Sequence, residues 1–332
     1  MAYRLKAKET IPEGVQRVVL EEITGAIEVL GKSGTAQRDE SVHEARKSIK
    51  KIRGVLRLAR PELRASYRDE NSRFREIGHL LSELRDAAAL LEVFDQLIGK
   101  FSGTLDPKSA ADIRRGLERE KNEVEQQLDL PKVVARAAGT LRSAQARVKR
   151  WPLRKDGFSA IAPGIKLTYR SGRKALKAAR KNYDPVSFHT LRKRVKDHWY
   201  HVRLLESVWT EVMEAHEKSL KELETWLGDN HNLAVLREKL EGQPDRFGGS
   251  ENVQVFLLLV SKYQEELRQN SLSLGARIYG VKPRAFVRSL GTLWDTWKQL
   301  PDTTNEVDQP QRENLKKQPP KTAARKSKRT AA

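Results

Sequence analysis

Hydrophobic residues recur at helical spacing along almost the whole chain. Between residues 43 and 59, for example, Ala45, Ile49, Ile52 and Leu56 fall on one side of a helical wheel. Runs that alternate apolar and polar residues between hairpin dipeptides are almost absent, so the pattern does not favour strands. The periodicity predicts ten helices, over residues 12–30, 38–60, 62–101, 108–129, 132–150, 162–181, 186–209, 211–241, 251–279 and 284–299.

Capping and proline signals mark where several of these helices begin. Ser41 and Glu44 have the spacing of a capping box. Asp184 before Pro185 is typical of an N-cap followed by proline at the first helical position. Pro163 predicts a further boundary, because proline is tolerated in the first turn of a helix but disrupts its interior. Long amphipathic helices joined by short loops predict an all-α fold of antiparallel bundles.

Two segments of the chain are repeated at a separation of 146 residues. His43–Lys47 aligns with His189–Lys193, and Leu81–Asp86 aligns with Leu227–Asn232. Two separate matches at one separation indicate an internal duplication. The sequence therefore predicts two duplicated helical bundles of four to five helices each, over residues 1–150 and 151–301, followed by a disordered basic tail over residues 302–332.

Composition narrows the possible classes of protein. The chain has no cysteine, which excludes disulfides, zinc–thiolate sites, iron–sulfur clusters and a cysteine nucleophile. The longest apolar run, Val255–Val260, is far shorter than the roughly 20 residues of a membrane span. Residues 1–14 lack the apolar core of a signal peptide. We expect a cytoplasmic protein without a membrane partner.

The net charge of +20 is concentrated in one part of the chain. Residues 131–205 hold 20 Lys and Arg but only three acidic residues. A solubilising surface normally mixes both signs of charge. Such an excess therefore indicates a polyanionic partner, although a solvated basic face without a specific partner stays open.

Three predicted helices carry cationic stripes beside their apolar sides. Like charges one turn apart on a helix destabilise it by a few tenths of a kcal/mol per pair, and a bound anion would recover this energy. We expect the stripes to converge on one shared basic groove. The candidate polyanion-binding residues are His43, Arg46, Lys47, Lys50, Arg53 and Arg57 on the predicted helix 38–60, Lys166, Arg170, Arg173, Lys174 and Lys177 on helix 162–181, and His189, Arg192, Lys193, Lys196 and Arg203 on helix 186–209.

No arrangement of residues indicates catalysis. The sequence has no phosphate-binding glycine loop, no nucleophile elbow and no acidic metal cluster. His198 and His201 have a spacing that suits a metal, but no carboxylate completes a site on their face of the helix. We therefore expect no enzymatic activity, no cofactor and no metal.

The repeated histidine motif resembles the CHAD family, the conserved-histidine α-helical domains. The resemblance rests on His43-x-x-Arg46-Lys47 with its second copy at His189, on Thr168–Lys174 and on Leu227–Leu233, and it covers roughly residues 10–300. It implies two duplicated helical bundles with a basic surface between them, binding of inorganic polyphosphate, and association with polyphosphate granules.

Two other functions compete with polyphosphate binding. The charge permits nucleic-acid binding, although aromatic residues make up only 6% of the chain and are not interleaved with the cations for base stacking. A phosphoanhydride-processing enzyme would need a metal site or an acidic base, which the acid-poor segment 131–205 hardly offers. Chain-length preference, oligomeric state and a polyphosphate-metabolising enzyme as partner stay open.

Overall fold

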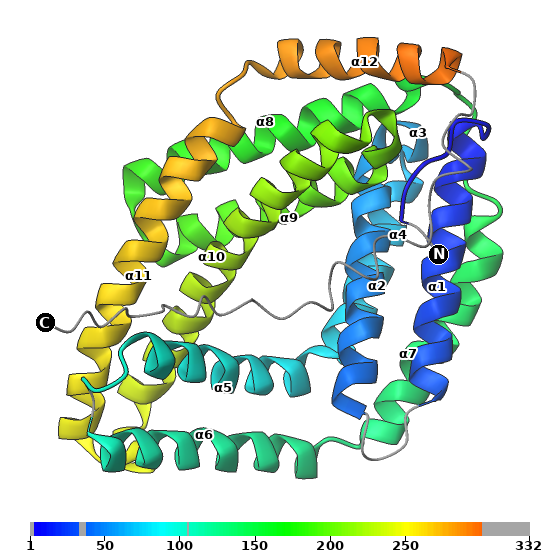
Figure 1. Cartoon of the computed structure of the whole chain (residues 1–332). Helices are drawn as coiled ribbons and strands as arrows, with labels where there is room; N and C mark the ends of the chain where they lie inside the picture. The colour runs from blue at the N-terminus through cyan, green and yellow to red at the C-terminus, as the bar shows by residue number, and fades with distance from the viewer. Residues whose placement is uncertain (1–2, 33–37, 105, 301–332) are drawn as a thin grey trace, which may run out of the picture.

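The computed structural model describes residues 3–32, 38–104 and 106–300, and all regular elements in this part are helices (Figure 1). The predicted all-α fold class is thus confirmed. None of the described helices has the length and apolar character to cross a membrane. The predicted tail, residues 302–332, lies outside the described residues. The α-helices are α1 (Ile11–Gly31), α2 (Arg38–Leu58), α3 (Arg60–Leu63), α4 (Ser66–Leu80), α5 (Ser82–Lys100), α6 (Pro107–Gln127), α7 (Leu130–Val148), α8 (Phe158–Asn182), α9 (Pro185–Leu204), α10 (Thr210–Gly242), α11 (Ser250–Ile278) and α12 (Pro283–Gln299).

The helix boundaries confirm some of the predicted signals and correct others. Asp184 caps α9 by accepting a hydrogen bond from the Ser187 backbone N–H at 2.6 Å. The predicted capping box at Ser41 is wrong, because α2 begins three residues earlier. The boundary predicted at Pro163 is also wrong, because α8 begins at Phe158. The proline costs α8 one backbone hydrogen bond, which burial of the helix on both sides of it offsets.

The order of paired helices in the first half of the chain recurs in the second half. α1 packs against α2 and α7, and α8 packs in the same way against α9 and α12. α5 pairs with α6, as the C-terminal part of α10 pairs with α11. One difference is that the long predicted helix 62–101 is broken into α3, α4 and α5, whereas α10 continues through 33 residues.

The hydrophobic cores do not follow the boundary predicted at residue 150. One core joins α1, α2, α4 and α7 to α8, α9, α12 and the start of α10. The other joins α5 and α6 to α11 and the end of α10. The reason is α10, which buries Leu220 and Leu227 in the first core and Leu233 and Leu240 in the second. Each core is therefore built from both halves of the chain.

Two glycines allow α2 to lie close to the basic helices. A Cβ added to Gly164 of α8 would stand 2.0 Å from the Leu58 carbonyl oxygen of α2. A Cβ added to Gly54 of α2 would stand 2.7 Å from the Tyr200 Cβ of α9. Side chains at these positions would force the helices apart. The glycines therefore fix the spacing between the cationic stripes.

Candidate functional site

The crossing of α2 and α9 brings the two histidine helices together. At the crossing, His201 Nε2 lies 3.1 Å from the Gly54 carbonyl oxygen. Lys50 of α2 therefore lies among Lys196 and Arg192 of α9. Burial lowers the pKa of Lys50 to about 7, and repulsion from Lys196 adds to this shift. The stripes of α2 and α9 therefore approach each other at Lys50, Arg192 and Lys196.

A hollow between α2 and α4, with a volume of about 230 Å³, is rich in cations. Arg46 is fixed at one end by donating hydrogen bonds to the carbonyls of Leu81 at 3.1 Å and Ser82 at 2.8 Å. Among the described residues of the lining, the one acid is Asp86, which lies 3.2 Å from Arg46 and is two-thirds exposed. Charged and titratable side chains that line this α2–α4 hollow are Arg46, Lys50, Arg53, Arg75, His79 and Asp86.

Further along α2, the cations surround a buried carboxylate. Asp197 of α9 lies 3.2 Å from Arg57 and 3.4 Å from Arg194. These three side chains and Arg60 line a smaller hollow of about 120 Å³ against α8. Burial, followed by repulsion from Arg57, lowers the pKa of Arg53 to about 10. Arg57 is therefore the partner of an internal acid as well as part of the stripe.

Several other predicted residues also have acidic partners. Lys196 Nζ lies 2.7 Å from Glu224 Oε1 of α10. Burial alone would raise the pKa of Glu224, but Lys196 and Lys221 outweigh it and hold the value at about 2. The remaining paired candidates are Lys47, which lies 2.5 Å from Glu44, and Arg203, which lies 3.2 Å from Glu217.

Some histidines are partly buried at the candidate site, whereas others are buried in the hydrophobic core. His189 packs against His231 of α10 with 4.2 Å between ring centroids, while His43 lies partly buried on the first half of α2. Burial, with Lys193 next, lowers the pKa of His189, and burial lowers that of His231 to about 4. His198 is buried in the core. Within the described residues, no group of three or more His, Asp or Glu side chains is placed to hold a metal ion.

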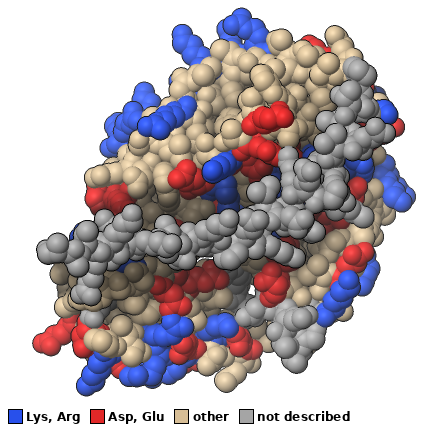
Figure 2. All heavy atoms as spheres, viewed as in Figure 1, with Lys and Arg blue, Asp and Glu red and all other residues tan. Residues whose placement is uncertain are grey.

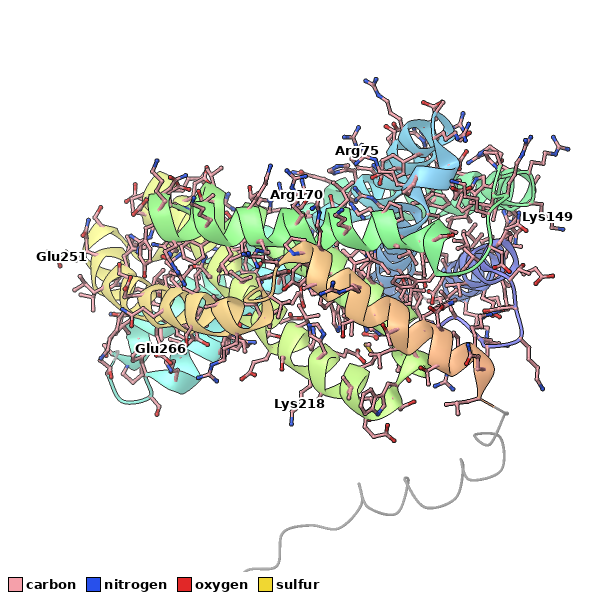
Figure 3. The ribbon with its side chains drawn as sticks, turned by 90° about the horizontal axis from the view of Figure 1, so that it is seen from above. Arg75, Lys149, Arg170, Lys218, Glu251 and Glu266 are labelled. Carbon is pink, nitrogen blue, oxygen red and sulfur yellow. The ribbon has the colours of Figure 1, made fainter. Side chains whose placement is uncertain are left out.

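The outer face of α8 carries cations that, unlike those described above, are exposed and not ion-paired with any acid in the described residues. From Lys166 to Lys181 they extend about 22 Å along the helix axis. None of them forms an ion pair with any acid in residues 3–32, 38–104 or 106–300. Arg170 projects from the same side of the molecule as Arg75 of α4, whereas Lys218 projects from the opposite side (Figure 3). We call this set the α8 ridge; its exposed members are Lys166, Arg170, Lys174, Lys177, Arg180 and Lys181.

Arg173 lines neither the α2–α4 hollow nor the smaller hollow between α2, α8 and α9. Its guanidinium donates hydrogen bonds to the Gly280 carbonyl at 3.1 Å and to the Val281 carbonyl, both just after α11. With Lys177 and Arg180 it lines a third hollow, of about 230 Å³, between α8 and α11. The predicted cations therefore line more than one hollow, and the α8–α11 hollow includes two members of the α8 ridge.

The family of the chain follows from its sequence. The family model of the CHAD domain matches residues 23–241, well over half of the chain. The chain belongs to the CHAD family. The match includes both histidine helices and the whole of α8. Among curated proteins, none matches the chain.

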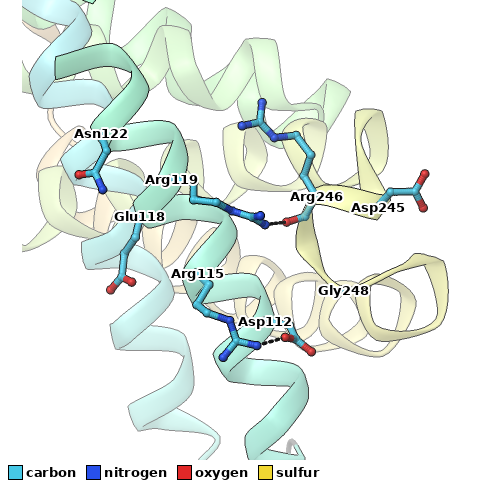
Figure 4. Close-up of a pocket in the computed structure, with 8 residues that line it drawn as sticks. All are labelled: Asp112, Arg115, Glu118, Arg119, Asn122, Asp245, Arg246 and Gly248. Carbon is cyan, nitrogen blue, oxygen red and sulfur yellow. Dashed lines mark hydrogen bonds and ion pairs between the residues drawn. The ribbon is translucent and has the colours of Figure 1, made fainter. Parts of the chain in front are cut away.

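Another hollow of this CHAD protein, of about 450 Å³, lies away from the predicted residues, between α6 and the short helix Pro244–Phe247 (Figure 4). Arg115 pairs with Asp112 there, and Arg119 donates to the Arg246 carbonyl at 2.8 Å. On the face shown in Figure 2, both signs of charge are likewise interspersed. The pairing of Arg115 with an acid distinguishes this hollow from the α8 ridge.

Some residues of the candidate site were missed by the sequence analysis. Arg75 and His79 line the α2–α4 hollow from α4, which carries no copy of the histidine motif. Glu224 pairs with Lys196 from a helix without unusual composition. Asp197 did carry a signal, because it is one of only three acids in residues 131–205. An acid in so basic a segment is typical of an internal partner for a cation.

Proposed function

We propose that this CHAD protein binds inorganic polyphosphate and does not process it chemically. The observation that carries the proposal is the α8 ridge, whose exposed cations have no acidic partner in the described part of the chain. Keeping them on one helix face costs stability through mutual repulsion. A linear chain of phosphoryl groups would neutralise the ridge along its whole length, which supports an extended ligand over a compact one.

The proposed mechanism is charge neutralisation on a rigid surface. Lysine and arginine contact phosphoryl oxygens, and arginine does so with two parallel hydrogen bonds. Counterions that are condensed on the polyanion are released, so the affinity should fall steeply with salt, as it does for DNA. The cations that already pair with Glu224 and Asp197 then serve to hold the helices together.

A titration of the full chain with long-chain polyphosphate, triphosphate and duplex DNA at two salt concentrations tests the proposal. We expect the long chain to bind most tightly and to lose affinity with salt. Displacement of long-chain polyphosphate by duplex DNA at equal phosphate concentration would instead favour nucleic-acid binding. Release of orthophosphate from polyphosphate with Mg²⁺ or Mn²⁺ present would contradict a purely binding role.

A further inference from the structure

Lys50 differs from Lys196, the other lysine at the α2–α9 crossing, in having no partner among the described residues. Lys196, its neighbour, is neutralised by Glu224 at 2.7 Å. Glu224 also accepts a hydrogen bond from Lys221 at 3.0 Å, so both of its oxygens are engaged. No side chain or carbonyl in the described residues forms an ion pair or hydrogen bond with the Lys50 ammonium group.

Taken over all neighbouring helices, most of the charges that face Lys50 are positive. On α1, Glu22 is engaged by Lys51 at 2.7 Å on another side of α2. On α5, Asp86 is held by Arg46. The groups facing Lys50 are Arg46 and Arg53 on α2, Arg75 and His79 on α4, Asp86 on α5, Arg192 and Lys196 on α9, and Glu224 on α10.

The hollow is cationic and open to an anion. A bound anion would favour the charged form of Lys50, and charged Lys50 would in turn favour binding of the anion. We propose that the α2–α4 hollow is a phosphoryl-binding site in which Lys50 takes up one proton from solvent when the anion enters. The Nζ atom changes from NH₂ to NH₃⁺, and no covalent bond to phosphorus forms or breaks. This inference rests on the proposed function and adds a site and a proton to it.

The sign of the coupling follows from the charges. In the free chain the pKa of Lys50 is lowered to about 7, so much of the lysine is neutral above that pH. A phosphoryl group beside it favours the charged form and raises the pKa. Binding therefore takes up a proton above about pH 7, and the affinity falls as the pH rises. The pKa values of His189 and His231 are lowered below 6.5, so these histidines stay neutral in that range.

Isothermal titration at about pH 8, in two buffers of different ionisation enthalpy, measures the proton uptake. With long-chain polyphosphate we expect the wild-type chain to take up about one proton per site. Lys50→Arg should still bind but take up almost none, because the guanidinium stays charged. Lys218→Arg makes the same change on the side of the molecule opposite Arg75, which lines the hollow, and should leave the uptake unaltered (Figure 3).

A second measurement needs no ligand. In the free wild-type chain labelled with ¹³C-lysine, one Cε resonance should titrate near pH 7 and should be missing from Lys50→Arg. Polyphosphate binding without proton uptake, or equal uptake by Lys50→Arg, would overturn the coupling and leave the proposed function standing. A chain that shows the Lys50 titration but binds no polyphosphate at any pH would overturn the proposed function and the phosphoryl site with it.

Discussion

α1 and α8 occupy equivalent places in the two halves of the chain, yet they carry their charges in opposite ways. On α1, Arg17 lies 2.6 Å from Glu9 and 3.3 Å from Glu21, and Glu22 pairs with Lys51. α8 has no acid at all. Both helices pack in the same way against the helix that follows them. The packing of this CHAD protein is therefore repeated, whereas its surface charge is not.

The comparison teaches that the fold does not require the α8 ridge. α1 shows that the same position can be filled by a helix whose arginine, Arg17, is ion-paired with acids. The excess of unpaired cations on α8 is then a property of the surface and not of the core. Changes to the ridge should alter binding while leaving the helical packing intact.

The largest effect is expected from removing the ridge. Replacing Arg170, Lys174, Lys177 and Lys181 together by glutamine should weaken polyphosphate binding roughly 100-fold and make its salt dependence shallower, because four phosphate contacts are lost. Helical circular dichroism should be unchanged, since all four side chains are exposed.

A matched variant separates the ridge from net charge. Replacing four exposed lysines elsewhere by glutamine removes the same number of positive charges; they are Lys32, Lys108, Lys132 and Lys218. This variant should lose little affinity. Equal losses for the two variants would mean that overall charge, and not the ridge, governs binding.

A smaller effect is expected from exchanging one pair of charges between the equivalent helices. Glu28 of α1 and Lys174 of α8 are separated by the repeat distance of 146 residues, and both are exposed. Lys174→Glu should weaken binding roughly tenfold, because it places an acid within the ridge. Adding Glu28→Lys restores the net charge but should not restore the affinity. Recovery in the double variant would show that the two halves bind equally.

Much of the fold could be predicted from the sequence because helical periodicity and capping are local. Asp184 and Pro185 fix the start of α9 without help from distant residues. The division of the cores could not be predicted, because it depends on α10 passing from one to the other. Within the site, the stripes were visible in the sequence. The acids that neutralise Lys196 and Arg57 are brought to them by tertiary packing, so these ion pairs could not be predicted from the sequence.

A further prediction concerns pH below the range in which Lys50 titrates. Burial and Lys193 lower the pKa of His189, so the free histidine is neutral at pH 7. If phosphate lies beside it, the charged form is favoured, and the affinity should rise as the pH falls below about 6.5, by at most about tenfold per pH unit. His189→Gln should remove this rise and keep the pH dependence above 7. Titrations from pH 7 to 5 measure it, and a flat wild-type profile would exclude His189 from binding.

Amine footprinting tests the central claim most directly. The free and polyphosphate-bound chain would be acetylated briefly, and the modification of each lysine would be measured by mass spectrometry. We predict strong protection of Lys166, Lys174, Lys177 and Lys181, with Lys32, Lys108 and Lys218 unprotected on the same molecules. Equal protection of both groups, or protection confined to the second, would contradict the claim that the unpaired cations of α8 form the principal binding surface.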